Sequence, residues 1–251
     1  MRVDLDVRDR VAVVTLVDSE RRNAMSGPMV SDIAATFDRI EADDGVGAVV
    51  VTGAPPAFCS GADLSSLGSI GEGLSESGSV LAIYEGFLRV LRSPLPTIAA
   101  VNGPAVGAGM NLALACDLRV AGESARFDAR FLRIGLHPGG GHVWMLERAV
   151  GPQAAAAMVL FGEVLDGSGA AQFGLAWSVH PDGELLDAAV DLARKAAAVP
   201  QELTARAKQT LRRAPWQPSF EAAVDLEVEH QTWSFGRPHF MDAMRARRER
   251  Q

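Results

Sequence analysis

The stretch "AVNGPAVGAGMNLALACD", residues 100–117, decides how this chain folds, because it joins an apolar segment to a helical pattern through a glycine-rich turn. Pro104 breaks the predicted strand, and Gly107 and Gly109 precede an Ala- and Leu-rich run. Glycine lets other groups approach the backbone closely, and the first N–H groups of a helix have no intrahelical partner. The stretch therefore predicts a strand, a tight turn and a helix whose first N–H groups face a ligand.

A second turn of this kind lies earlier in the chain. The segment "FCSGADL", residues 58–64, follows the continuously apolar run at 46–53, which we expect to be a strand buried on both faces. If the two helix starts converge, one N–H from each turn polarises a single carbonyl oxygen. This device is an oxyanion hole, in which one donor is typically worth about 3–4 kcal/mol.

A dinucleotide site is the alternative for the same glycines, since Gly107-Ala108-Gly109 resembles the beginning of the G-x-G-x-x-G fingerprint. The sixth position of that fingerprint is Leu112, and residues 102–104 separate the strand from the glycines. The fingerprint therefore fails, although Asp128 lies near the position of its acidic residue. We favour the carbonyl-binding interpretation.

Strands and helices alternate along the first part of the chain. Ser26 is the predicted N-cap of a helix that has Pro28 in its first turn. The pattern predicts strands at 10–17, 46–53, 95–103 and within 118–128, and helices at 26–43, 109–117 and from 140 onward. Such an alternation is typical of a layered α/β domain with mainly parallel strands.

Two segments depart from this alternation. Residues 65–79 are rich in Ser and Gly, so we expect a mobile surface loop. From about residue 184 the pattern becomes helical, with helices predicted at 184–198, 200–214 and 220–233. We therefore divide the chain into a core, residues 1–183, and a C-terminal helical region, residues 184–251, which packs on its own core or on another subunit.

Composition and charge argue against several classes of protein. The net charge is −7 at pH 7 with acidic residues spread along the chain, which argues against a nucleic-acid surface. The basic segment "RARRER", residues 245–250, is interpreted as a solvated last helical turn, with a polyanion site as the alternative. No apolar run reaches the roughly 18 residues of a membrane span, and the first residues lack the apolar region of a signal peptide.

The cysteines and histidines give two further expectations. Cys59 and Cys116 lie in apolar runs and are expected to be reduced thiols, as in a cytoplasmic protein. The five histidines are accompanied by no H-E-x-x-H motif and no clustered carboxylates, so no metal site is predicted.

Several ordered motifs together resemble the enoyl-CoA hydratase/isomerase, or crotonase, superfamily over nearly the whole chain. They are "RRNAMS" (21–26), "AFCSGADL" (57–64), "AVNGPAVGAGMNLALACDLRVA" (100–121), "ARF" (125–127) followed by "IGLHPGGG" (134–141), and "ARKAA" (193–197). The resemblance implies an α/β crotonase (ClpP-like) spiral of β-β-α units with a C-terminal helical trimerisation region. It also implies an acyl-CoA ligand, no separate cofactor, and a homotrimer or dimer of trimers that acts in fatty-acid or acyl-CoA metabolism.

The resemblance places the oxyanion donors at the backbone N–H groups of Ala62 and Ala108. It places the CoA-contacting loop at residues 23–25, so that Asn23 and Ala24 are candidate binding residues. Arg21 or Arg22 could meet a phosphate, with a solvated turn as the alternative. Gly61 and Asp63 belong to the first turn, where Asp63 is interpreted as the cap of the following helix rather than as a chemical group.

The two glutamates used by the hydratases of this family have no counterpart in this chain. The first would fall at Asn111, whose amide can orient a water molecule but cannot take its proton near neutral pH. The second would fall at Phe131, which fills that position with an apolar ring. Because the isomerases of the family need a base at the second position, Phe131 also argues against their usual mechanism.

Other residues could replace the missing acid and base. His137 and His142 flank Pro138 and the glycines from Gly139, in a loop that the resemblance places at the acyl pocket, and a neutral imidazole is a competent base. A hydrogen-bonded packing role is the alternative for both. Asp128 is interpreted as a surface turn or cap residue, and Glu147 as an exposed helix residue.

Aromatic residues cluster near the end of the chain, where Trp233, Phe235 and Phe240 surround Arg237. Subunit packing is the preferred interpretation, and contact with the adenine end of CoA is the alternative. Two functions stay open at this point. One is an enzyme with His142 as a substitute acid and base. The other is a non-catalytic acyl-CoA carrier or sensor in which Asn111 and Phe131 leave the acyl pocket dry.

Overall fold

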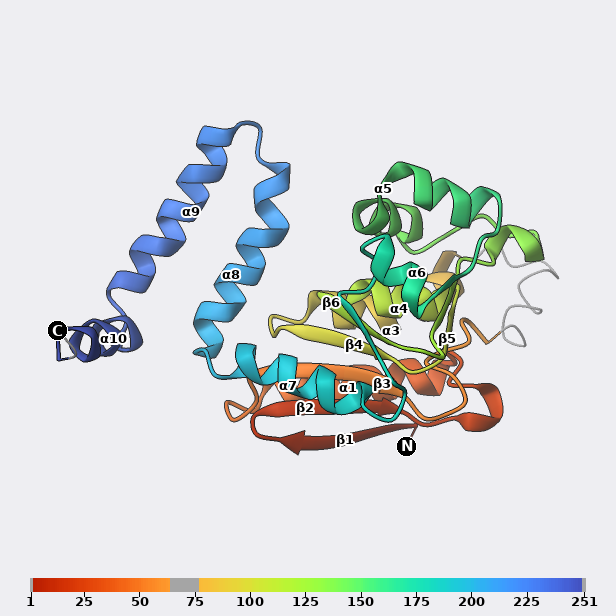
Figure 1. The fold of residues 1–251 in the computed structure, drawn as a ribbon, viewed down its shortest axis with the longest axis horizontal. Coiled ribbons are helices and arrows are strands. Elements are labelled where there is room, and N and C mark those ends of the chain that lie inside the picture. Colours follow the sequence, from red (N-terminus) through yellow and green to blue (C-terminus); the bar gives the residue numbers. More distant parts are fainter. Residues whose placement is uncertain (1, 64–76, 250–251) are drawn as a thin grey trace.

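The structure is a computed structural model that describes residues 2–63 and 77–249, and it contains two sheets with helices packed around them (Figure 1). The larger sheet has the strand order β1-β2-β3-β4-β6-β9. Its strands are β1 (Val3–Arg8), β2 (Val11–Leu16), β3 (Ala48–Gly53), β4 (Thr97–Val101), β6 (Leu118–Gly122) and β9 (Ser178–His180). All neighbouring strands pair in parallel except β1 and β2, which form an antiparallel hairpin. Every residue of β3 is buried, as the continuously apolar run predicts.

The smaller sheet has the order β5-β7-β8 and consists of β5 (Pro104–Val106), β7 (Arg126–Asp128) and β8 (Leu165–Asp166). The chain passes from one sheet to the other four times, at β4 to β5, at β5 to β6, at β6 to β7 and at β8 to β9. A further bridge between Cys59 and Ala105 places the segment after β3 beside the smaller sheet. This winding confirms the predicted spiral, because from β4 to β9 the chain returns repeatedly from one sheet to the other and adds strands to both.

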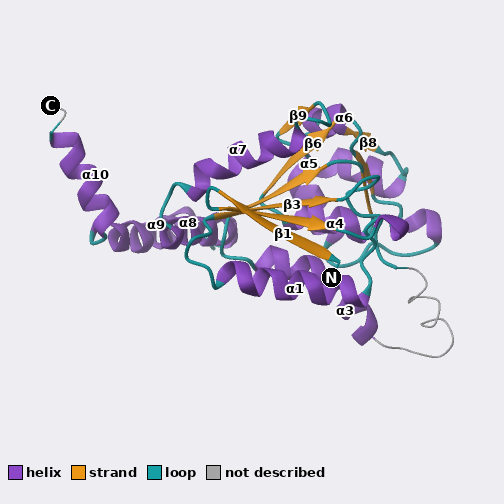
Figure 2. Ribbon diagram, turned by 90° about the horizontal axis from the view of Figure 1, so that it is seen from below, coloured by secondary structure: helices purple, strands orange, loops and turns teal. Residues whose placement is uncertain are grey.

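Helices cover both faces of the larger sheet (Figure 2). Helices α1 (Gly27–Glu41) and α3 (Ser77–Arg92) lie on one face, and α7 (Leu185–Ala197) lies on the other. The N-cap prediction for α1 is confirmed, since the Ser26 hydroxyl accepts a hydrogen bond from the Met29 N–H at 3.4 Å. Helix α7 packs on the sheet with one apolar face, formed by Leu185, Ala189, Val190, Ala193 and Ala197.

The helix predicted from the opening stretch is α4 (Ala108–Ala115), and all eight of its residues are buried. Burial on every side explains why it is apolar almost throughout. Helix α5 (His142–Leu160) follows a short 3-10 helix, η3 (Phe131–Ile134), and changes direction at Gly151 and Pro152. Helix α6 (Gly167–Gln172) precedes β9. Helix α4 therefore lies at the centre of the fold, with its first turn at the smaller sheet.

The last three helices extend away from the two sheets as an arm (Figure 1). They are α8 (Gln201–Arg213), α9 (Phe220–Phe235) and α10 (Pro238–Arg248), with the 3-10 helix η4 (Ala214–Trp216) after α8. The buried Lys208 anchors α8, because its Nζ atom lies 2.6 Å from a carboxylate oxygen of Asp117 and 2.5 Å from the Leu95 carbonyl. Large apolar side chains on the arm are exposed, among them Leu211, Phe220 and Val228.

Several elements differ from the sequence predictions. Strand β1 and helix α3 were not predicted as elements, whereas the last helical turn predicted from residue 245 onward is the end of α10. Within the segment expected to be a loop, residues 77–79 belong to α3, and residues 65–76 lie outside the described part of the chain. Among the described helices, none is long and apolar enough to cross a membrane. Cys59 and Cys116 are buried without a disulfide, and burial raises the pKa of each thiol to about 12.

Candidate active site

The two glycine-rich turns are in direct contact. The Cys59 N–H donates to the Pro104 carbonyl at 3.1 Å, and the Val106 N–H donates to the Cys59 carbonyl at 3.0 Å. A Cβ atom on Gly109 would lie 2.1 Å from the Cys59 carbonyl oxygen. A Cβ atom on Gly61 would lie 2.8 Å from the Val106 carbonyl oxygen and 3.8 Å from the Ala108 nitrogen. Glycine at 61 and 109 is therefore what allows the turns to touch.

The contact brings two backbone donors into one region. Ala108 is the first residue of α4, after Gly107 at φ 52°, so its N–H has no acceptor within the helix. Ala62 lies in a parallel bridge with Met25 whose hydrogen bonds use the neighbouring Gly61 and Asp63 instead. Across residues 2–63 and 77–249, neither the Ala62 N–H nor the Ala108 N–H is bonded to an acceptor.

The loop at residues 23–25 is attached to the first turn. The Met25 N–H donates to the Gly61 carbonyl at 2.7 Å. The buried Asn23 side chain donates to the carbonyls of Ala54 and Ala57, each at 2.8 Å. Its oxygen accepts the Asp18 N–H at 2.8 Å. The fold therefore uses the Asn23 side chain to hold this loop in place.

The other residues predicted near this loop differ in their exposure to solvent. Ala24 is buried. Arg21 is exposed, and its guanidinium lies 3.5 Å from the Asp63 carboxylate. The helix that Asp63 was predicted to cap falls on residues outside the described part of the chain.

Asn111, His142 and Gly139 form a hydrogen-bonded group beside α4. The Asn111 Nδ2 atom donates to the Gly139 carbonyl at 3.0 Å, and its Oδ1 atom lies 2.7 Å from Nδ1 of His142. Asn111 and His142 are each about 1% exposed. The opposite imidazole nitrogen, Nε2 of His142, is buried and has no hydrogen-bond partner among the residues that the structure describes. Sequence reasoning named all three residues, and the fold brings them together.

His142 is held in its neutral form. Burial lowers its pKa from 6.5 to about 4, so the ring carries no charge at neutral pH. Its ring lies against Phe131 in an edge-on arrangement with 4.9 Å between ring centroids. Phe131 in turn contacts the second turn, because its Cζ atom lies 3.8 Å from the Cβ position of Gly107. One aromatic ring therefore touches both the imidazole and the turn that presents the Ala108 N–H.

Tyr84 lies beside this group and was not named by sequence reasoning. A Cβ atom on Gly139 would lie 2.1 Å from the Tyr84 hydroxyl oxygen, so a side chain there would displace the Tyr84 hydroxyl. A Cβ atom on Gly140 would lie 2.5 Å from Phe87 and 3.0 Å from the Asn111 amide nitrogen. Tyr84 is the one tyrosine of the chain, which was the available signal, but its helix α3 was not recognised.

Comparison with known proteins identifies the family of the chain. The family model described as enoyl-CoA hydratase/isomerase matches residues 6–250. The chain belongs to the enoyl-CoA hydratase/isomerase family. It is 47% identical over 251 residues to a probable enoyl-CoA hydratase, EchA14, of Mycobacterium tuberculosis, with 98% of this chain and 97% of the relative covered.

Two further comparisons extend the family relationship. The chain is 34% identical over 228 residues to the 1,2-epoxyphenylacetyl-CoA isomerase of Escherichia coli, with 90% of this chain and 87% of that protein covered. The crystal structure of a probable enoyl-CoA hydratase/isomerase from Mycobacterium abscessus superposes with a TM-score of 0.88. It is 32% identical and covers 100% of this chain and 97% of its own. The family assignment therefore extends over the whole described fold.

Asp128 differs from its prediction in this family member. It was expected on the surface, and that expectation was wrong, because its side chain is 5% exposed. Its carboxylate lies 2.7 Å from Arg130 and 3.6 Å from Arg133, and these cations compensate for its burial. Its other oxygen, Oδ1, is buried and accepts no hydrogen bond from the described part of the chain. Glu147 is exposed on α5, as predicted.

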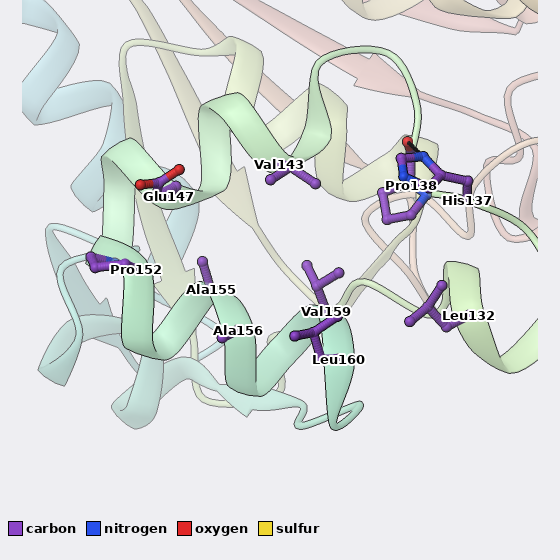
Figure 3. Close-up of a pocket in the computed structure, with 10 residues that line it drawn as sticks. All are labelled: Leu132, His137, Pro138, Val143, Glu147, Pro152, Ala155, Ala156, Val159 and Leu160. Atoms are coloured by element: carbon purple, nitrogen blue, oxygen red, sulfur yellow. Dashed lines mark hydrogen bonds between the residues drawn. The ribbon is translucent and has the colours of Figure 1, made fainter.

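A cavity of about 410 Å³ lies between the 132–138 segment and the two arms of α5 (Figure 3). Apart from His137 and Glu147 its lining is apolar: Leu132, Pro138, Val143, Pro152, Ala155, Ala156, Val159 and Leu160. His137 is exposed, and its Nδ1 lies 2.7 Å from the Pro138 carbonyl. Of the two histidines expected near an acyl pocket, His137 lines this cavity. His142 faces Asn111 instead.

The C-terminal aromatic residues do form a cluster. Phe235 and Phe240 lie 5.3 Å apart between ring centroids, and the Arg237 guanidinium lies 4.3 Å from the Trp233 ring centre. A second cluster joins the arm to α5, since Trp144 and Trp216 stack at 5.6 Å with Arg148 against both rings. These contacts hold cationic and aromatic side chains together along the arm.

Proposed function

We propose that the chain is an acyl-CoA-binding enzyme of enoyl-CoA hydratase/isomerase type that holds a thioester carbonyl between the N–H groups of Ala62 and Ala108. The observation that carries the proposal is the contact between their two turns, in which neither N–H group is bonded to an acceptor among residues 2–63 and 77–249. Two such donors stabilise the negative charge that develops on the thioester oxygen when an enolate forms. The relatives are named as enzymes that act on CoA thioesters, which supports this ligand class.

The remaining parts of the ligand are assigned by position. The loop with Asn23 and Ala24, and the turn with Gly61 and Asp63, would contact the CoA moiety. The attachment of that loop to the turn through Met25 supports this assignment. The CoA thioester is the ligand, and the proposal includes no separate cofactor. We place the enzyme in the cytoplasm, in fatty-acid or related acyl-CoA metabolism, and its two buried thiols fit a reducing compartment.

His142 is the proposed base, because Asn111 and Phe131 occupy the positions of the usual glutamates. In hydration, Nε2 of His142 takes a proton from water while the water oxygen bonds to the β-carbon of a 2-enoyl thioester. The electron pair of the double bond moves to the thioester oxygen, held by Ala62 and Ala108. The imidazolium then returns the proton to the α-carbon, so that the net change is the addition of one water molecule.

A non-catalytic acyl-CoA carrier is the second candidate, and one observation favours it. The Phe131 ring lies edge-on against His142 and touches the turn before Ala108. An aromatic ring at that place would keep water away from the thioester. In this alternative Phe131 and Asn111 are binding residues, and His142 is a packing residue.

We also propose that the arm packs against neighbouring copies, as a homotrimer or a dimer of trimers. Exposed apolar side chains on α8 and α9 support this, among them Leu211, Phe220 and Val228. Large exposed apolar surfaces are uncommon on monomeric proteins and often mark interfaces. Sedimentation equilibrium distinguishes the two assemblies from a monomer by mass.

One experiment tests the function directly. The purified protein is incubated with a series of saturated and 2-enoyl-CoA thioesters of short to long chain, with binding measured by calorimetry and products by mass spectrometry in the same samples. A mass gain of one water molecule on a bound 2-enoyl-CoA supports the enzyme. Binding without any product supports the carrier, and the absence of binding contradicts both.

A further inference from the structure

Asn111 has a defined orientation in this structure because both of its partners are fixed. The Gly139 carbonyl can only accept, so the amide group 3.0 Å away must present its NH₂ there. The amide oxygen then faces Nδ1 of His142 at 2.7 Å. The reverse orientation would set two acceptors against each other at the Gly139 carbonyl.

This orientation decides which imidazole nitrogen carries the hydrogen. An amide oxygen accepts only, so Nδ1 of His142 must be the donor, and in a neutral ring Nε2 then carries the lone pair. No charged side chain accounts for the neutral state, which results from burial alone. Nε2 is buried and has no hydrogen-bond partner within residues 2–63 and 77–249, so this part of the fold does not use its lone pair.

We propose that Asn111 is a positioning residue that fixes His142 in its Nδ1–H tautomer and thereby presents an unprotonated Nε2 to the acyl-CoA ligand. The inference rests on the proposed function only in the last step, the presence of that ligand. Asn111 also donates its backbone N–H to the Gly107 carbonyl at 3.0 Å, so its place on α4 is tied to the turn before Ala108.

The geometry sets Asn111 apart from a simple packing residue. If residue 111 only packs, a substitute must match its volume and its hydrogen bonds. If it positions His142, a substitute needs only an acceptor at the atom that faces Nδ1 of His142. Asn111→Asp keeps that acceptor and loses the donation to Gly139. Asn111→Leu is close in volume and removes both. The two variants therefore separate the effect of Asn111 on the tautomer of His142 from its effect on packing.

The test is the tautomer of His142, read from two-bond ¹H–¹⁵N correlation spectra of the full-length protein with ¹⁵N-labelled histidine. The His142 signals are assigned by their loss in His142→Gln. At pH 7 we expect the wild-type ring to have a protonated Nδ1 and a bare Nε2, which is the opposite of the tautomer that free histidine prefers. Asn111→Asp should retain this pattern, and Asn111→Leu should lose it in favour of the Nε2–H form or a mixture.

Two results would overturn the inference. One is a wild-type His142 with hydrogen on Nε2, and this needs no variant to fold. The other is a folded Asn111→Leu protein that keeps the Nδ1–H form. The spectra contain no acyl-CoA, so this outcome is independent of turnover. An Nδ1–H tautomer in a protein that binds acyl-CoA without converting it would refute the catalytic proposal and leave the tautomer assignment intact.

Discussion

Ala108 and Asn111 lie three residues apart on α4, so the helix turn that begins with the Ala108 N–H also carries the amide bonded to His142. Residues at this spacing share one face of a helix. The position of the proposed carbonyl donor is therefore coupled to that of the proposed base. A change at either residue should affect the other through the backbone of this single turn.

Replacing Ala108 with proline tests the carbonyl donor. Proline is tolerated at the first position of a helix, which Ala108 occupies, so Ala108→Pro removes the N–H while α4 keeps its remaining hydrogen bonds. Loss of one oxyanion donor costs about 3–4 kcal/mol, so we expect thioester turnover to fall roughly 10²- to 10³-fold. The control is a CoA thioether in which CH₂ replaces the carbonyl, whose affinity should be unchanged. If Ala108→Pro also lowers the affinity for the thioether, the variant disturbs the site as a whole.

The contact between the turns predicts a steric penalty at Gly109. A Cβ atom there would lie 2.1 Å from the Cys59 carbonyl oxygen, and backbone must move to make room. We expect Gly109→Ala to lower the free energy of unfolding by about 1–3 kcal/mol and to weaken acyl-CoA binding. Gly27→Ala is the matched control, because Gly27 is also helical and has nothing within 4 Å of its Cβ position. Urea unfolding compares the two, and equal stability would contradict the contact.

Burial of His142 predicts a specific dependence of stability on pH. Between pH 6.5 and about 4 the unfolded chain binds a proton at this residue and the folded chain does not, so the free energy of unfolding falls as pH decreases. The full effect of His142 is about 3 kcal/mol. His142→Gln cannot titrate, so the stability difference between wild type and variant should shift by that amount from pH 7 to 4. If the free energies of unfolding of wild type and His142→Gln change equally with pH, the imidazole is not buried as described.

The anchor of the C-terminal arm is the buried Lys208, one of the two lysines in the chain. Lys208→Met keeps most of the apolar stem but leaves the Leu95 carbonyl and the Asp117 carboxylate with one donor fewer, at a cost of about 1–3 kcal/mol. The other lysine, the exposed Lys195 on α7, supplies the control Lys195→Met, for which we expect a change within about 0.5 kcal/mol. Urea unfolding measures both, and an unchanged Lys208→Met would contradict the anchor.

The parallel strands could be predicted because burial on both faces leaves a continuous apolar run, as at 46–53. Strand β1 was missed because it lies at the edge of the sheet, where charged residues such as Asp4 and Asp6 alternate with apolar ones. Helix α3 follows directly on a Ser- and Gly-rich segment that masks its start. Edge strands and helices after such segments have weak sequence signals because half of their surface faces solvent.

The site shows a similar division. The glycines at 61 and 109 could be recognised from their turns, because close backbone approach leaves no room for a side chain. The pairing of Asn111 with His142 could not be recognised from the sequence, because it joins positions 31 residues apart through packing of α4 against α5. The burial of Asp128 was mispredicted because its compensating partners, such as Arg130, become apparent only once η3 is formed.

The central claim, that Ala62 and Ala108 hold a thioester whose α-carbon exchanges a proton with His142, is tested most directly by deuterium exchange. Butyryl-CoA is incubated with the protein in D₂O, and deuterium at the α-carbon is measured by mass spectrometry after binding is confirmed by calorimetry. We predict that the wild-type protein incorporates deuterium at the α-carbon and that His142→Gln binds the thioester without incorporating it. Wild-type protein that is saturated with butyryl-CoA and yet incorporates no deuterium at the α-carbon would contradict the claim.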